Sequence, residues 1–182
     1  MKRQLLAAAV IAVAVWAATA AQPQVDRDSL ATLERRFDKR IQSYNANDPF
    51  HLLGNTRAVY LQDYGVVFTS ELNLVAAAVV TPFRPSFTPE QIEELRQKKL
   101  RRVNDLLGIM RSMMVDSATS LKSVPPGQRI AIGVSLFRFG WEDSRELPSQ
   151  ILMEARRQEL LDFEAGRLDT ARLAAVTRIT EF

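Results

Sequence analysis

The stretch that decides the fold is residues 88–122, which read TPEQIEELRQKKLRRVNDLLGIMRSMMVDSATSLK. It is the longest uninterrupted helical pattern in the chain. Thr88 is suited to cap a helix, Pro89 suits the first helical position, and Gln91 completes a capping box in which side chains bind free backbone groups. The segment therefore predicts one long helix that begins after Thr88.

Apolar residues recur along this segment at helical spacing and predict a buried stripe. At ~1.5 Å per residue the helix would be roughly 50 Å long, whereas a domain of this length is about 40 Å across. We therefore expect the charged half, residues 90–102, to extend beyond the body unless the helix bends at Gly108. The apolar half, residues 103–121, should pack under a sheet. The stripe consists of Ile92, Leu95, Val103, Leu106, Met110, Met113 and Leu121, widened by Leu107 and Met114.

Two regions rich in β-branched and aromatic residues flank the long helix and predict strands. Residues 57–74 contain a turn at Gln62–Gly65, where Gly65 can adopt a positive φ. This region predicts a β-hairpin whose inward residues are Val66, Phe68, Leu72 and Leu74. Residues 129–139 have two largely apolar faces and predict a central strand with cover on at least part of each side.

An apolar stripe near the start of the chain predicts a helix over residues 29–44, capped by Asp28 or Ser29. Its inward residues are Leu30, Leu33, Phe37, Ile41 and Tyr44.

The segment after Pro148 fits two structures. Its composition favours one helix, whereas its alternation fits a strand over 150–157 followed by a short helix over 158–165. The need of the preceding strand for a partner favours the strand. A last helix is expected over 170–177, capped by Asp169, with Leu173 and Val176 inward.

These elements predict an α+β domain in the order α-ββ-α-ββ-α. Its antiparallel sheet would consist of two hairpins packed against one long central helix. The domain would span residues 29–182.

The first twenty residues have the features of a secretory signal peptide. Lys2 and Arg3 precede an uncharged apolar run over residues 5–16, and Ala18-Thr19-Ala20 forms a small-x-small cleavage signal. The apolar run is shorter than the ~20 residues of a membrane span, so cleavage is favoured over the alternative, retention as an anchor. We expect a signal peptide over 1–20, a flexible leader over 21–28, and export to the periplasm or medium with no transmembrane span after cleavage.

The composition excludes several classes of site. The chain of 182 residues has no cysteine, which excludes disulfides and thiolate metal sites. Without Lys2 and Arg3, 22 Lys+Arg remain against 21 Asp+Glu, a net charge of +1. This balanced charge does not predict a nucleic-acid partner.

Motifs for catalysis are also missing from the sequence. His51 is the only histidine, too few for a zinc site of the usual kind, and no Gly-x-Ser-x-Gly or phosphate-binding glycine loop occurs. Glu71 and Glu154 are the only strand carboxylates that would suggest a glycosidase pair. We therefore predict no catalytic, cofactor-binding or metal-binding residues and no cofactor.

The strongest polar feature is a cluster of five cations in seven residues of the long helix. One interpretation is a solvated helix face, supported by a Glu94–Lys98 pair. The other is a surface that binds a partner protein or an anionic envelope component such as lipid headgroups or glycans. The candidate binding residues are Arg96, Lys98, Lys99, Arg101 and Arg102.

The function that fits these observations is that of an exported, non-enzymatic binding or structural protein of the bacterial cell envelope. One alternative is a hydrolase-like periplasmic enzyme whose site residues are scattered in the sequence. Another is a self-associating module that forms homo-oligomers through the long helix.

The predicted export can be tested by the mass and N-terminus of the exported protein. We expect the mature chain to begin at Ala21, and Ala20→Trp to leave an unprocessed precursor because signal peptidase requires a small residue there. Gln22→Ala is the matched control and should be processed normally. An exported wild-type chain that still begins at Met1 would show an anchor instead.

Overall fold

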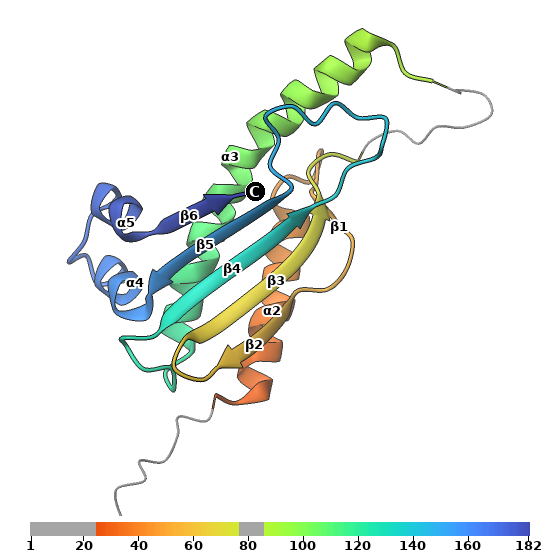
Figure 1. Ribbon diagram of the computed structural model, residues 1–182. Helices are drawn as coiled ribbons and strands as arrows, with labels where there is room; N and C mark the ends of the chain where they lie inside the picture. Colours follow the sequence, from red (N-terminus) through yellow and green to blue (C-terminus); the bar gives the residue numbers. More distant parts are fainter. Residues whose placement is uncertain (1–24, 77–85) are drawn as a thin grey trace, which may run out of the picture.

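The computed structural model describes residues 25–76 and 86–182, so the predicted signal peptide and the first half of the predicted leader lie outside these ranges. The described chain is a mixed α+β fold with one sheet and one long helix (Figure 1). In none of its helices is a stretch long and apolar enough to cross a membrane. The elements are α2 (Arg27–Ser43), β1 (His51–Leu52), β2 (Arg57–Leu61), β3 (Gly65–Asn73), α3 (Pro89–Ser120), β4 (Arg129–Leu136), β5 (Gln150–Arg156), α4 (Arg157–Glu164), α5 (Thr170–Val176) and β6 (Arg178–Glu181).

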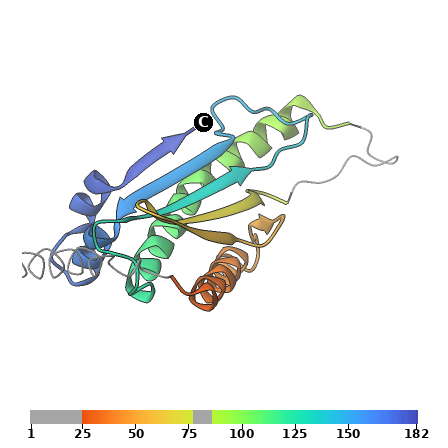
Figure 2. The same ribbon diagram turned by 60° about the horizontal axis from the view of Figure 1, so that its bottom comes forward.

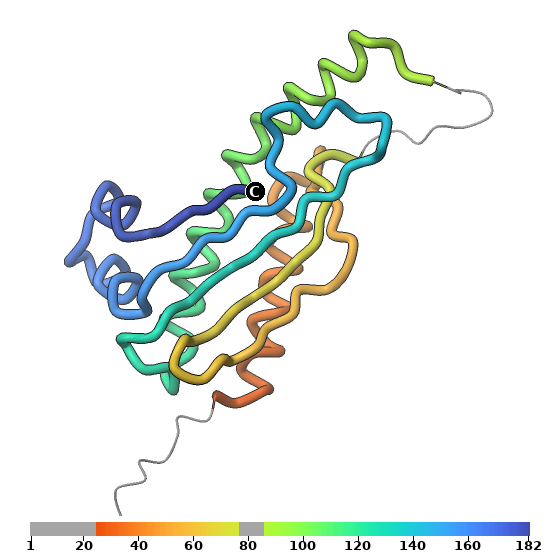
Figure 3. Tube along the Cα trace, in the orientation of Figure 1, coloured from red at the N-terminus to blue at the C-terminus, as the bar shows by residue number. Residues whose placement is uncertain are grey.

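The sheet is mixed, so the predicted purely antiparallel sheet is wrong. Strands β3, β4, β5 and β6 are neighbours in that order, while β1 and β2 both pair with β3. The pairing of β3 with β4 is parallel, with Val66 opposite Ile130, and the other pairings are antiparallel. Figure 3 shows the same path as a continuous trace.

The parallel pairing follows from the place of α3 in the chain. Parallel neighbours need a crossover connection, usually a helix, to return the chain to the end where the first strand began. Helix α3 lies between β3 and β4 in sequence and returns the chain in this way. Both predicted hairpins form, but they meet through β3 and β4 as parallel strands.

Helices α2 and α3 cover one face of the sheet, and no described helix covers the other face (Figures 1 and 2). We call this other face the open face. The outward residue Ala131 is nevertheless fully buried, so β4 has the expected partial cover on this side, although no described helix provides it. The small outward residues Gly133 and Ser135 are partly exposed, the strand ends at Leu136, and Phe137 is 36% exposed.

The core lies between the covered face and the two helices, largely as the apolar patterns predict. Helix α2 begins two residues earlier than expected because Asp26, rather than Asp28 or Ser29, accepts the capping hydrogen bond, from the Ser29 N–H. Tyr44, predicted to face inward, lies just beyond the helix and is 47% exposed. The buried residues include Leu30, Leu33, Phe37, Ile41, Val66, Phe68, Leu72, Leu74, Leu106, Met110, Met113, Ile132 and Met153.

The C-terminal part resolves the ambiguity after Pro148. The strand β5 and the short helix α4 form where the alternation predicts them. In α5, Asp169 caps the helix and Leu173 is buried, but Val176 is 37% exposed, contrary to the prediction. The short strands β1 and β6 were not predicted, so the observed element order is longer than α-ββ-α-ββ-α.

Helix α3 begins as predicted and runs without a break. Thr88 and Gln91 form the complete capping box. Gly108 does not interrupt the helix; it borders a hollow of about 320 Å³ that is also lined by Phe163 and Leu173.

Arg157 closes the C-terminal end of α3. Its side chain, in a residue only 7% exposed, donates from Nε to the Ala118 carbonyl and from Nη1 to the Val124 carbonyl, both at 2.9 Å. The last turn of α3 has no basic residue of its own. A cation there satisfies free carbonyls and the negative end of the helix dipole, although burial lowers the pKa of Arg157.

Replacing Arg157 with Met should lower the free energy of unfolding by about 3 kcal/mol, because two buried carbonyls lose charged donors. Urea denaturation measures the change. The matched control is Arg172→Met on the exposed side of α5, which should stay within about 0.5 kcal/mol of the wild type. Equal effects of the two substitutions would contradict the capping role.

Candidate functional site

Four of the five predicted binding cations contact carboxylates of the same chain. Lys98 and Arg102 both reach Asp48, at 2.9 and 2.6 Å, and Arg102 also lies over the Phe50 ring, 4.1 Å from its centroid. Burial opposes ionisation of Asp48, but the hydrogen bond from Lys98 and the charge of Arg102 outweigh it and lower the pKa of Asp48. These contacts hold the loop after α2 against α3.

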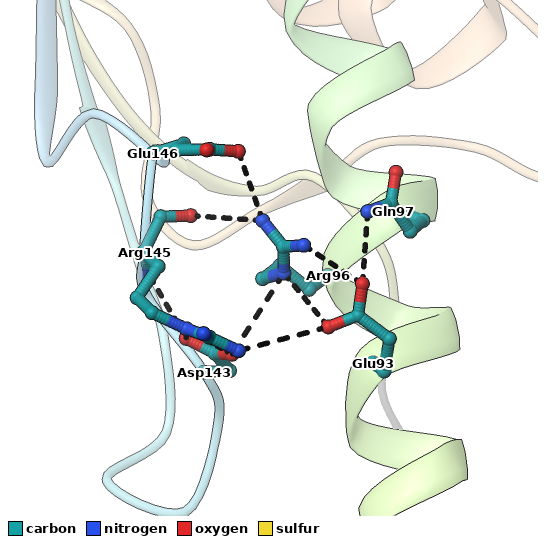
Figure 4. A network of polar contacts seen from close by, with 6 residues as sticks. All are labelled: Glu93, Arg96, Gln97, Asp143, Arg145 and Glu146. Atoms are coloured by element: carbon teal, nitrogen blue, oxygen red, sulfur yellow. Dashed lines mark hydrogen bonds and ion pairs between the residues drawn. The ribbon is translucent and has the colours of Figure 1, made fainter.

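Arg96 lies at the centre of a surface network between α3 and the loop of residues 137–149 (Figure 4). It contacts Glu93 at 2.7 Å, Glu146 at 3.0 Å and Asp143 at 3.7 Å. Hydrogen bonds from Arg96 and then Gln97 lower the pKa of Glu93 to about 2. Glu93 therefore stays ionised at neutral pH.

Lys99 forms a buried ion pair with Glu142 from the same loop. The side chains are only 3% and 2% exposed. A buried charge without a partner is strongly unfavourable, so this pair fixes the loop on the first half of α3. Glu142 also accepts a hydrogen bond from the Phe139 backbone N–H at 3.3 Å.

The charged half of α3 extends past the end of the sheet, as expected, but the loops hold it (Figure 1). In the part of the chain that the structure describes, Arg101 is the one cation of the five that contacts no carboxylate. Anion binding by these residues stays a prediction. It would depend mainly on Arg101 and on Lys98, whose side chain is 40% exposed.

A row of aromatic rings connects the end of β4 with the start of α3. Phe137 and Phe139 meet edge to face with centroids 5.1 Å apart, and Phe139 and Trp141 stack at 5.8 Å. Trp141 in turn stacks on Phe87 at 4.1 Å. These contacts give the loop an apolar side as well as its charged side.

The open face carries exposed apolar residues among polar ones. Val59 and Leu61 on β2 are 50% and 44% exposed. Around Gly133, where a side chain is missing, the face has a hollow of about 220 Å³, which is lined also by Thr69 and Leu152. The central rows across β3, β4 and β5 are Val67–Ala131–Glu154, Thr69–Gly133–Leu152 and Glu71–Ser135–Gln150.

One end of the open face carries a group of three arginines, which we call the basic cluster: Arg129, Arg156 and Arg178. They surround the nearly buried Glu154, whose Oε1 lies 3.4 Å from Arg129 Nη1 and 3.5 Å from Arg178 Nη1. Arg156 contacts no carboxylate with its guanidinium group in the described ranges. The cluster therefore keeps a positive excess.

Tyr64 completes the surroundings of Glu154. Its hydroxyl donates to Glu154 Oε2 at 2.6 Å. Burial, followed by the hydrogen bond to Glu154 and its charge, raises the pKa of Tyr64 to about 12. The phenol thus stays protonated and keeps donating to Glu154 at neutral pH.

Gly65 allows the backbone of β3 to lie close to the backbone of Arg129 at the start of β4. Its φ is +132°, and a Cβ there would lie 1.9 Å from the Arg129 carbonyl oxygen. The Arg129 N–H donates to the Tyr64 carbonyl at 2.7 Å. The glycine predicted from the turn is therefore also needed where β4 starts beside β3.

The structure separates the other residues that the sequence suggested for catalysis. Glu71 and Glu154 lie two strands and four residues apart, roughly 16 Å, which exceeds the spacing of about 5–9.5 Å in glycosidase pairs. His51 is exposed on β1. Among the residues with a described placement, no three His, Cys, Asp or Glu side chains form a group suited to a metal ion.

No family model matches the sequence, and no curated protein or solved structure matches it significantly.

The basic cluster could not be predicted directly from the sequence because its members come from three different strands. One signal was available. Arg129 and Arg156 lie at the outer ends of two strands expected to form a hairpin, so a fixed hairpin register would have placed them opposite each other.

Replacing one partner of the Lys99–Glu142 pair should be far more harmful than replacing both. We expect Lys99→Met and Glu142→Leu each to lower the free energy of unfolding by about 3–5 kcal/mol, and the double variant to cost less than either. Urea denaturation of all four proteins measures the coupling. Lys98→Met is the exposed control and should cost less than about 1 kcal/mol; additive effects of Lys99 and Glu142 would contradict the buried pair.

Proposed function

We propose that the protein is an exported, non-enzymatic binding protein of the bacterial cell envelope that holds a partner on its open face. The observation that supports this most is the one-sided cover of the sheet, with Val59 and Leu61 about half exposed on the uncovered side. Export is supported by the signal-peptide pattern of residues 1–20.

The composition of the open face supports binding over simple contact with water. When one face of a sheet is in solvent, each strand normally alternates between inward apolar residues and outward polar residues. Here Val67 and Leu152 are only partly buried and lie on either side of the small residues Ala131 and Gly133. An apolar surface bordered by charged groups is typical of an interaction site.

The outer side of α3 gives less support to the alternative of self-association through the helix. Its exposed residues are polar or charged apart from Pro89 and Gly108, so a helix contact would bury little apolar surface. They include Glu94, Gln97, Arg101, Asn104 and Asp105.

Site-specific crosslinking in the native cell tests the proposed surface. A photoreactive amino acid at Leu61 or Thr69, on the open face, should give a discrete adduct. The same amino acid at Gln42 or Lys122, which are exposed away from this face, should not. Adding Gly133→Leu, which fills the hollow, should remove the adduct from Thr69.

Two results would contradict the proposal. One is the absence of any adduct from the open-face positions while the protein is folded and exported. The other is the same set of adducts from all four positions, which would indicate random collisions.

A further inference from the structure

The basic cluster contains an arrangement that is unfavourable in the isolated protein. Arg129 and Arg156 are directly opposite each other in the β4–β5 ladder, on the open face. Directly opposite residues have Cβ atoms roughly 5 Å apart, and like charges in such a pair are destabilising. An anion bound between the two guanidinium groups would relieve this repulsion.

The chain itself supplies too little negative charge near Arg129 and Arg156 to relieve the repulsion between them. Glu154 is shared between Arg129 and Arg178 and already accepts the Tyr64 hydroxyl. Glu159, the first acidic residue after Arg156 in sequence, accepts the Arg156 backbone N–H at 3.0 Å. Three guanidinium groups therefore face one shared carboxylate, and the excess charge points to an acidic ligand.

The hollow at Gly133 fixes the distance between the apolar and acidic parts of that ligand. Gly133 and Arg129 lie on the same strand and the same face, four residues or about 13 Å apart. Space is available at Gly133, because an added Cβ would meet only the Phe68 carbonyl oxygen, at 3.9 Å. A ligand that uses both features must present an apolar side chain about 13 Å from its carboxylates.

From these features we infer that the open face binds an acidic amphipathic helix of a partner protein, which would complete a helix–sheet–helix sandwich. This inference depends on the proposed binding function. Helices are the usual cover for a sheet face, and α2 and α3 already cover the opposite face in this way. The small residues Gly133 and Ser135 line the hollow along β4, with Thr69 and Leu152 beside them. In a helix, about 13 Å corresponds to roughly eight or nine residues.

Fluorescence anisotropy with designed peptides tests the inference. The probe is an 18-residue helical peptide of Leu, Ala and Glu, with leucines on one face and glutamates eight or nine residues from the central leucine. The full mature chain should bind it in a salt-sensitive manner. Versions with Lys in place of Glu, or with scrambled order, should bind at least about tenfold more weakly.

Variants of the protein locate the site. Arg129→Gln/Arg156→Gln should weaken binding about tenfold or more, and Gly133→Leu should weaken it by filling the hollow. Arg35→Gln/Arg172→Gln removes the same charge from exposed positions on α2 and α5 and should leave binding unchanged. Arg156→Gln alone should raise the urea midpoint at low salt, and the gain should disappear at high salt, because it relieves the like-charge pair.

Other results would overturn the inference. Binding that survives Arg129→Gln/Arg156→Gln, equal binding of the Lys peptide, or tighter binding of an extended Thr-Val-Glu peptide would exclude an acidic helix at this site. So would binding of anionic phospholipid vesicles without binding of the peptide. Discrete crosslinks from Leu61 and Thr69 together with any of these results would leave the proposed function intact; absence of those crosslinks would count against both.

Discussion

Helix α3 is longer than the sheet that it crosses, and much of the structure follows from this mismatch. Its 32 residues span about 48 Å, whereas the nine residues of β3 span about 30 Å. The first turns of α3 therefore have no sheet to pack on. Two loops hold them instead, through Asp48 on one side and Glu142 on the other. The loop that carries Glu142 also carries Trp141, so the same ion pair positions the aromatic row beyond β4.

The edges of the sheet are closed in a way that leaves its open face as the available surface. Along β2, Glu34 accepts the Ala58 N–H and Asp38 accepts the Thr56 N–H, both at 2.8 Å. Arg27 also donates to the Ala58 carbonyl at 3.3 Å. At the other edge, β6 has only four residues, two of them charged, and short charged edge strands resist pairing with another chain. A partner strand would therefore have few free backbone N–H and C=O groups to pair with at these edges. A partner helix on the open face does not require such groups.

The local elements were predictable because their signals lie close together in sequence. Thr88 and Gln91 are three residues apart and fix the start of α3, and the turn at Gly65 fixes the first hairpin. The parallel pairing of β3 with β4 was not predictable in this way, since it depends on where a 32-residue helix returns the chain. Lys99 shows the same limit within the candidate site. Its neighbours indicate a solvated helix face, yet its partner Glu142 is 43 residues away and buries it.

Lys99 and Arg156 differ in whether the chain supplies them with an anionic partner, and this difference favours ligand binding at the open face. Lys99 and Arg102, although nearly buried, each reach a carboxylate, and Arg157 reaches two carbonyls. Arg156 is exposed, lies opposite another arginine and reaches no carboxylate in the described ranges. Local conflicts of this kind persist where function requires them. The fold thus supplies partners for cations that it buries, while the repulsion between Arg129 and Arg156 lies on the face that no described helix covers. A negatively charged helix on that face would remove the conflict and the exposed apolar surface together.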